Sequence, residues 1–423
     1  MPQYWLGRRV LCVRIPATLF VMSRKPYFTG EKGEKAMNEH SKSFWVLSFV
    51  VVALLAAPSQ AQVSFSIDVW SPSVQSAQIT SPNPTVFPDD IFDQMGLVGF
   101  VPPPPLLQIN GMALGGMGGS FVEVNAYSQG RPLNQFSTSA SAFFSVDRGS
   151  AGVAGTATSN EFNIVGGSEQ SSDVFFSTFN SNNTLFLDGD GVASGANPAA
   201  PPLALAEPTT VGGPILPIPP TLVGDLDGLD LRRAGGVSPS TRIYFSVDQG
   251  TVIGGTYGPI SAADIFVNQL ISGYNQPVGG VAGNPPAAPV YAAESMLGFG
   301  QFMGNDLDAL VVFDNGDGQY LPGTDIIVFS LAPGSGFLGQ TDSLLGWTVS
   351  PGDILVDGWT AMALGAANPT VGILHTAESL GLRTMRSGVQ SDDNLNALDI
   401  PEPATLLLLT IGSLILTRKR KCA

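Results

Sequence analysis

Cysteine is almost absent from this chain of 423 residues, which contains two, Cys12 and Cys422, near its two ends. Residues 62–400 contain no cysteine and no lysine, and His375 is their single histidine. Without cysteine, this stretch has neither a disulfide framework nor a thiol nucleophile. Without a second histidine, neither a Cys-His pair nor a typical zinc site can be assembled. Burial of a hydrophobic core must therefore hold these residues together, and the stretch is long enough to form one.

Positive charge is also scarce in residues 62–400. Seven arginines stand against 24 aspartates and six glutamates, which gives a formal charge of −23. A polyanion would be repelled and there is no basic stripe, so the composition excludes a nucleic-acid-binding role. Direct binding of an acidic polysaccharide is disfavoured for the same reason, unless a divalent cation bridges the two.

The C-terminal segment joins three features in a fixed order. Pro401-Glu402-Pro403 is followed by an apolar run over 404–417 and by a basic end, Arg418-Lys419-Arg420-Lys421. The prolines keep the chain extended ahead of the apolar run, and the basic end favours the cytoplasmic side of a membrane. As a helix, the 14 apolar residues would rise about 21 Å against a hydrocarbon core of about 30 Å. We therefore expect snorkelling of the basic side chains or local thinning of the bilayer.

Residues 401–423 resemble the PEP-CTERM sorting domain of Gram-negative bacteria, which has a Pro-Glu-Pro box, a transmembrane helix and an Arg-rich terminus. The resemblance implies recognition by a membrane-embedded exosortase, cleavage near the box, and export linked to extracellular polysaccharide. It also implies that the precursor is held in the membrane by the transmembrane segment 404–417 before processing. A plain single-span anchor is the alternative interpretation.

The N-terminal region predicts a matching export signal when translation starts at Met37. Lys42 precedes an apolar stretch over 44–57, and Ser59-Gln60-Ala61 supplies the small residues of a signal-peptidase site. The sequence therefore predicts a signal peptide over 37–61 that uses the Sec translocon and is cleaved between Ala61 and Gln62. Residues 1–36 have no role in this scheme, and a misassigned upstream start codon accounts for them.

Residues 62–400 contain a repeated set of short sequence elements. Phe65-Ser66-Ile67-Asp68 recurs at 144–147 and 245–248, and its first three positions recur at 329–331. A second element begins with an aspartate before branched or aromatic residues, at Asp90, Asp173, Asp264 and Asp353, with spacings of 83, 91 and 89 residues. A third element occupies 225–229, 306–310 and 394–398, with a weaker counterpart at 121–125. A fourth occupies 289–295 and 371–379, with a possible version at 185–187.

These elements predict an all-β domain of four repeats of about 85–90 residues, each with four short strands. The domain begins with the first element and ends with the third, although the third precedes the first at every internal junction. The two ends are thus complementary halves of one junction, which favours a propeller-like closed ring without open sheet edges. A β-solenoid or tandem β-sandwiches are the alternatives. We expect surface loops at 102–105, 180–183 and in the Pro/Ala-rich insert 195–220, which is apolar enough to fold back on the ring.

Two Asp-Gly segments resemble calcium loops in composition. They place Asp188 with Asp190, and Asp314 with Asp317, and calcium prefers several oxygen ligands on a flexible turn. Neither has the ligand spacing of an EF-hand, and turn chemistry alone accounts for Asp-Gly pairs. The acidic third element could also aim alternate carboxylates at a central channel and form a ring that binds calcium, but the sequence favours solvent-facing strand positions or caps of the backbone between units. Calcium is the only cofactor that the sequence suggests.

Catalytic signals are weak. His375 could act as a general base, but a lone histidine in an apolar strand is more often structural. The glycine-rich stretch 111–119 lacks the G-x-G-x-x-G order, so we expect a flexible loop there and not a phosphate site. We assign no catalytic residue. The sequence predicts a non-enzymatic, exported cell-surface or extracellular-matrix protein with a structural or adhesive role linked to exopolysaccharide. A secreted propeller hydrolase or lyase acting on polysaccharide, and a calcium-dependent adhesin, are the alternatives.

Overall fold

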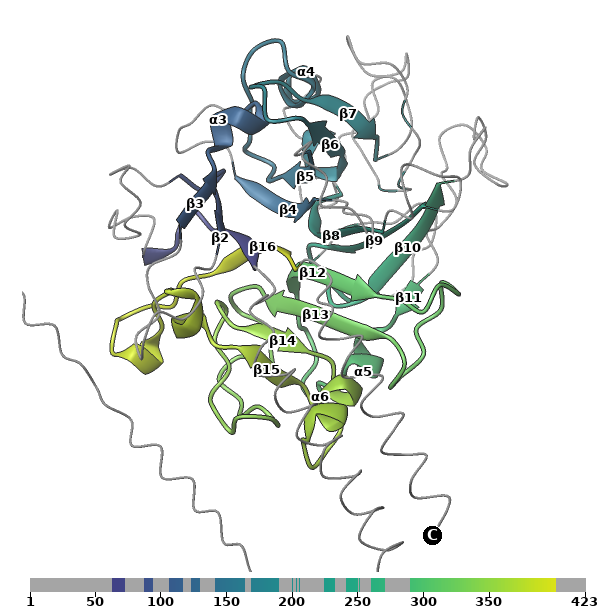
Figure 1. The fold of residues 1–423 in the computed structure, drawn as a ribbon, viewed down its shortest axis with the longest axis vertical. Helices are drawn as coiled ribbons and strands as arrows, with labels where there is room; N and C mark the ends of the chain where they lie inside the picture. The colour runs from purple at the N-terminus through teal and green to yellow at the C-terminus, as the bar shows by residue number, and fades with distance from the viewer. Residues whose placement is uncertain are drawn as a thin grey trace, which may run out of the picture. The chain divides into compact units, whose positions relative to one another are not determined.

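The structure, a computed structural model, is a four-bladed β-propeller. It describes residues 63–72, 87–93, 106–116, 123–129, 141–163, 169–189, 200, 203, 205, 224–232, 241–249, 251, 260–270 and 290–400. Within these residues, sixteen strands form four antiparallel sheets of four strands each. Figure 1 shows the sheets as blades around a common centre, where β4, β8, β12 and β16 lie.

Each blade is a meander that runs from the centre of the ring outward. The first blade, in spatial order, contains β16 (Leu395–Asp399), β1 (Ser64–Ile67), β2 (Ile91–Asp93) and β3 (Leu106–Ile109). The second contains β4 (Val124–Ser128), β5 (Ala142–Val146), β6 (Val174–Ser177) and β7 (Thr184–Leu187). The third contains β8 (Leu226–Arg232), β9 (Thr241–Val247), β10 (Ile265–Leu270) and β11 (Val290–Ala292). The fourth contains β12 (Leu307–Phe313), β13 (Ile326–Leu331), β14 (Ile354–Val356) and β15 (Gly372–His375).

Short helices join or follow the outer strands of the blades. The α-helices are α3 (Gly111–Leu114), α4 (Ala157–Phe162), α5 (Glu294–Leu297) and α6 (Gly358–Leu364). The 3-10 helices are η1 (Glu169–Ser172), η3 (Ala377–Leu380) and η4 (Met385–Ser387). In the described part of the chain, no helix has the length and apolar character needed to cross a membrane. The extension 1–36, the predicted signal peptide 37–61 and the predicted sorting tail 401–423 lie outside the described residues.

The ring is closed by strands from opposite ends of the domain. β1 pairs antiparallel with β16, so that Ser64 lies opposite Asp399 and Phe65 opposite Leu398. The predicted closed ring is therefore confirmed, and the solenoid and tandem-sandwich alternatives are excluded. The closing pair supplies β16 as the innermost strand of the blade that contains β1.

The first repeated element links each blade to the next through a side-chain hydrogen bond. Its phenylalanine lies on the second strand of a blade and is buried in all four copies. The serine after it turns to the other face and donates its hydroxyl proton to a backbone carbonyl of the next innermost strand. These four hydrogen bonds are Ser66 to Val124 (2.9 Å), Ser145 to Leu226 (2.9 Å), Ser246 to Leu307 (3.2 Å) and Ser330 to Leu395 (2.8 Å).

The aspartate of the second repeated element links the third and fourth strands of each blade. Its Oδ1 accepts a backbone N–H from the second residue after the outermost strand. The four hydrogen bonds come from Gly111 to Asp90 (3.0 Å), Gly189 to Asp173 (2.9 Å), Glu294 to Asp264 (2.8 Å) and Ala377 to Asp353 (2.8 Å). The carboxylate thus pairs backbone donors that the short outer strands leave unmatched.

One loop expectation needs correction and two are confirmed. Gly111–Leu114 forms helix α3 and not a flexible loop, because Asn110 caps its start and Gly115, with φ of 92°, ends it in the left-handed conformation. In the insert 195–220, Leu203 and Leu205 are fully buried in a hydrophobic cluster, so this part folds back on the ring. Residues 180–183 connect β6 and β7 as expected, whereas 102–105 lie outside the described residues.

We expect each serine-to-carbonyl hydrogen bond to stabilise the ring. Ser145→Ala and Ser246→Ala should each lower the free energy of unfolding by about 1–3 kcal/mol, because a buried carbonyl loses its donor. Urea denaturation followed by circular dichroism would measure the change, and Ser181→Ala, at an exposed turn position, is the matched control. Equal stability of all three variants would contradict a stabilising role for the hydrogen bonds between blades.

Candidate functional site

Acidic side chains gather where the four innermost strands begin. The third repeated element supplies two positions at the start of each of these strands, and the end of the neighbouring second strand supplies a third. We call the carboxylates at these positions the axial acid cluster. Its members are Asp68, Glu123, Asp147, Asp225, Asp227, Asp248, Asp306 and Asp308. Because the strands converge, residues far apart in the sequence become close neighbours.

The acids on β8 and β12 are buried. Asp227 is 7% exposed, Asp308 is 8% exposed and Asp225 is 3% exposed. Burial is the main cause that raises the pKa of each of these carboxyl groups well above its usual value, and repulsion from neighbouring carboxylates adds to it. The interpretation of these positions as solvent-facing is therefore wrong, and the acids do lie around the axis of the ring. The ring is incomplete, since Asn125, Asn394 and Asn396 take the equivalent places in the other two blades.

A single arginine reaches one side of the cluster in the described structure. Arg148 forms ion pairs with Asp225 at 2.9 Å and with Asp248 at 3.5 Å. Asn125 donates from its amide nitrogen to Asp225 and Asp227, each at 3.4 Å. These donors offset only part of the negative charge.

The opposite side of the cluster is short of donors. Asp306 Oδ1, Asp308 Oδ2 and the side-chain oxygen of Asn394 are buried and have no hydrogen-bond partner. Asp306 shares a hydrogen bond with Asp227, which requires a proton on one of the two carboxyl groups. Burial, followed by repulsion from Asp248, raises the pKa of Asp306 to about 7. One carboxylate oxygen from each of Asp227, Asp248 and Asp306 lies within 4.8 Å of the others.

The predicted calcium loop at Asp314 and Asp317 forms a second group with Asp325, and one oxygen from each lies within 4.8 Å of the others. Here the carboxylates already have donors. Asp314 Oδ2 accepts from Arg242 at 2.9 Å and from the Tyr244 hydroxyl at 2.8 Å. Backbone amides of the loop donate to most of the remaining oxygens; the donors are Asn315, Gly318, Gln319 and Leu321.

The loop is therefore organised as a hydrogen-bonded turn with its own counter-charge, as turn chemistry predicts. The other predicted pair is not brought into such a group in the described structure. Asp188 is buried at the end of β7, where its carbonyl accepts from the Leu203 amide, and Asp190 lies outside the described residues.

His375 is separated from the axial acid cluster. It ends β15, the outermost strand of its blade, while the cluster lies on the innermost strands. Burial lowers the pKa of its imidazole. The arrangement does not bring this histidine together with the axial carboxylates, as a shared catalytic cleft would require.

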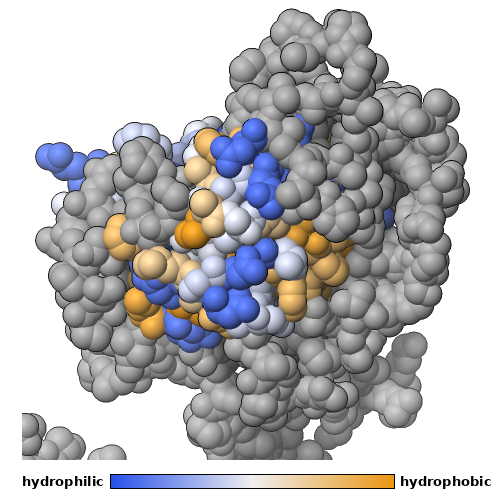
Figure 2. Space-filling view, turned by 90° about the horizontal axis from the view of Figure 1, so that it is seen from above, coloured by the Kyte–Doolittle hydropathy of each residue, from blue (hydrophilic) through white to orange (hydrophobic). Residues whose placement is uncertain are grey.

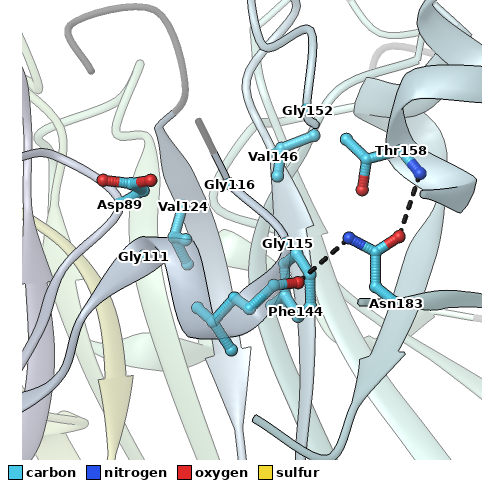
Figure 3. A pocket seen from close by; sticks show the side chains of 11 residues that line it. Asp89, Gly111, Gly115, Gly116, Val124, Phe144, Val146, Gly152, Thr158 and Asn183 are labelled. Atoms are coloured by element: carbon cyan, nitrogen blue, oxygen red, sulfur yellow. Dashed lines mark hydrogen bonds between the residues drawn. The ribbon is translucent and has the colours of Figure 1, made fainter. Parts of the chain in front are cut away.

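Figure 3 shows a small pocket near α3 that has a structural explanation. Asn183 donates to the Leu114 carbonyl and accepts from the Thr158 amide, both at 3.0 Å, and so ties three elements together. The Asp89 carboxyl packs so closely on Gly111 that a β-carbon there would lie 1.9 Å from Asp89 Cγ. The pocket lining is dominated by glycine and apolar residues, without histidine or arginine.

Sequence reasoning missed four acids that the fold brings to these groups. Asp68, Asp147 and Asp248 end copies of the first repeated element and join the axial acid cluster, and Asp325 lies just before β13 and joins the Asp314 group. The aspartate at the fourth position of the first element, present in three repeats, was the available signal for Asp248.

Comparisons of the chain with protein-family models, with curated proteins and with solved structures found no match.

Glu123 provides a test of the electrostatics of the axial acid cluster. Burial, followed by repulsion from Asp68 and Asp147, raises its pKa from 4.5 to about 9. The folded state therefore holds a proton that the unfolded state releases above pH 4.5, so this contribution to stability is complete below that pH and is lost as the pH rises toward 9. Glu123→Gln, which stays neutral, should show a smaller fall in melting temperature between pH 5 and 9 than the wild type.

The comparison is made by thermal denaturation in EDTA, so that divalent cations do not mask the charge. Glu378→Gln is the control, because its pKa is lowered and its titration lies below this pH range. Parallel melting curves for the wild type and Glu123→Gln across the range would contradict the buried, protonated state of Glu123.

Proposed function

We propose that this chain is the precursor of an exported cell-surface or extracellular-matrix protein. A signal peptide over 37–61 delivers it through the Sec translocon, and an exosortase processes it at the box formed by Pro401, Glu402 and Pro403. The closed propeller is the mature cargo, and it serves a structural or adhesive role next to extracellular polysaccharide.

The observation that carries this proposal is the position of the fold between the two expected signals. β1 begins at Ser64, just after the predicted cleavage between Ala61 and Gln62, and β16 ends at Asp399, just before Pro401. Ser64 and Asp399 are paired in the closing sheet. Removal of both terminal segments would therefore leave every strand of the propeller intact.

The charge of the mature stretch limits its partners. With a formal charge of −23 over residues 62–400, it would repel an acidic polysaccharide in the absence of a bridging cation. In the view of Figure 2, the described surface mixes hydrophilic and hydrophobic residues in small groups. Such a surface suits a neutral polysaccharide, or an acidic one bridged by divalent cations, better than a lipid surface.

A structural or adhesive role fits the geometry better than a hydrolase or lyase. A glycosidase needs two carboxyl groups that flank an accessible sugar. Asp225, Asp227 and Asp308 are instead buried between the innermost strands, and His375 lies on an outermost strand.

The ends of the native protein test the proposal. Mass spectrometry of the protein isolated from its cells should find Gln62 as the first residue and a C-terminus near Pro401 to Pro403, with no mature species that retains Arg418. The substitution Glu402→Ala should trap a membrane-bound precursor that keeps Arg418, whereas Leu407→Ile, within the apolar run, should be processed normally. A mature protein that contains both Met37 and Arg418 would overturn the proposal.

A further inference from the structure

We propose that the axial acid cluster holds a divalent cation of the calcium class, bound by Asp227, Asp248 and Asp306 with Asp308 beside them. This inference goes beyond the proposed export role, because it concerns the centre of the propeller and does not depend on how the protein is delivered or processed.

The first argument is the spacing of the oxygens. Two oxygens that bind one calcium ion, each at 2.3–2.6 Å, can be no more than about 5.2 Å apart. The three oxygens from Asp227, Asp248 and Asp306 lie within 4.8 Å of one another, which meets this limit.

The second argument is the presence of a buried carboxylate oxygen without a hydrogen-bond donor, and it does not depend on the number of acids. Asp308 is 8% exposed, and its Oδ2 is buried without a hydrogen-bond partner. Its charge acts on Asp227, Asp248 and Asp306, which places it against the same group. A buried carboxylate oxygen that lacks a donor is costly unless a cation contacts it. The unpartnered oxygens Asp306 Oδ1 and Asn394 Oδ1, on the same and the next innermost strand, extend the set.

The third argument is the position of the arginine. Arg148 pairs with Asp225 and Asp248, which lie on one side of the cluster. No ion pair in the described structure includes Asp227, Asp306 or Asp308. A divalent cation between these residues would supply the missing positive charge.

The chemistry of the donors selects the class of ion. All candidate ligands are carboxylate or amide oxygens, which suit calcium and magnesium and disfavour softer transition metals. Magnesium keeps several waters and demands near-octahedral geometry, whereas calcium accepts six to eight oxygens in irregular arrangements. A buried, irregular group of carboxylates from two blades fits calcium better.

The Asp314 group is the internal rival for the same ion, but its oxygens already have donors and Arg242 offsets part of its charge. Arg242 and Tyr244 both donate to Asp314 Oδ2, and Tyr291 donates to Asp325 at 3.1 Å. A cation there would have to displace or compete with these donors. The axial acid cluster has no such donor on Asp308 Oδ2.

Calcium titration of the full chain tests the inference. The protein, in mild detergent and stripped with EDTA, is titrated with Ca²⁺ and separately with Mg²⁺ in an isothermal calorimeter, and its melting temperature is recorded with and without each ion. We expect one calcium ion per chain at this site, a rise in melting temperature with Ca²⁺, and binding of Mg²⁺ at least tenfold weaker.

Three variants locate the ion. Asp306→Asn and Asp308→Asn should each weaken Ca²⁺ binding at least tenfold, and Asp317→Asn, at an exposed position of the rival group, should leave it unchanged. Without calcium, Asp308→Asn should melt no lower than the wild type, because it removes a buried carboxyl group that is repelled by neighbouring acids; this separates lost binding from lost folding.

The inference is overturned if Ca²⁺ produces neither binding heat nor a rise in melting temperature. It is equally overturned if Asp317→Asn abolishes binding while Asp306→Asn retains it, since the ion would then belong to the Asp314 group. Equal affinity for Mg²⁺ would overturn the calcium class. None of these results depends on signal cleavage or sorting, so the proposed function can stand or fall separately.

Discussion

The antiparallel pairing of β1 with β16 is the contact on which the rest of the structure depends. It joins the two ends of the folded domain and completes the blade whose innermost strand comes from the C-terminal end. Without β1, the innermost strand of this blade would have no neighbour in its own sheet, and the hydrogen bond from Ser66 to the Val124 carbonyl would be lost. Closure therefore makes the four blades one cooperative unit, in a domain that has no disulfide to hold it.

Closure also concentrates charge. The same convergence of innermost strands that buries Leu226, Leu307 and Leu395 brings the acids beside them to one end of the axis. Repulsion there works against folding, and a single arginine offsets part of it in the described structure. In the Asp314 loop, Arg242 and two tyrosine hydroxyls donate to the carboxylates. The cation proposed for the axial acid cluster would offset the charge that Arg148 leaves uncompensated.

Much of the fold could be predicted from the sequence because the repeated elements follow one another in the same order in each repeat. The phenylalanine and serine of the first element alternate between the two faces of a strand, and the order of the elements at the chain ends required a closing pair. The first blade was the hardest to complete, because its outermost strand, β3, has no recognisable copy of the fourth element. Helix α3 could not be predicted because it begins at a glycine and is followed by another. Gly111 is required at its start by close packing against Asp89, and Gly115 is required after its last residue by the left-handed cap.

The candidate site was less predictable. Asp227, Asp248 and Asp306 come from three different strand ends, and the antiparallel pairing of β8 with β9 and the junction of two blades bring them together. Sequence pattern identified the acidic third element but could not show that Arg148 would pair with one side of the cluster and that Asp308 Oδ2 would lack a donor. The export signals, by contrast, are local in sequence, so their prediction rests on residue order alone and awaits the analysis of the mature ends.

Hydrogen exchange of the backbone amides in β1 and β16 tests ring closure most directly. If the two strands close the propeller, their amides should be protected to the same degree and should exchange together with the innermost strands β4, β8 and β12, in a single cooperative opening. Rapid exchange of β1 while those innermost strands remain protected would mean that the ring is open, and would contradict the account.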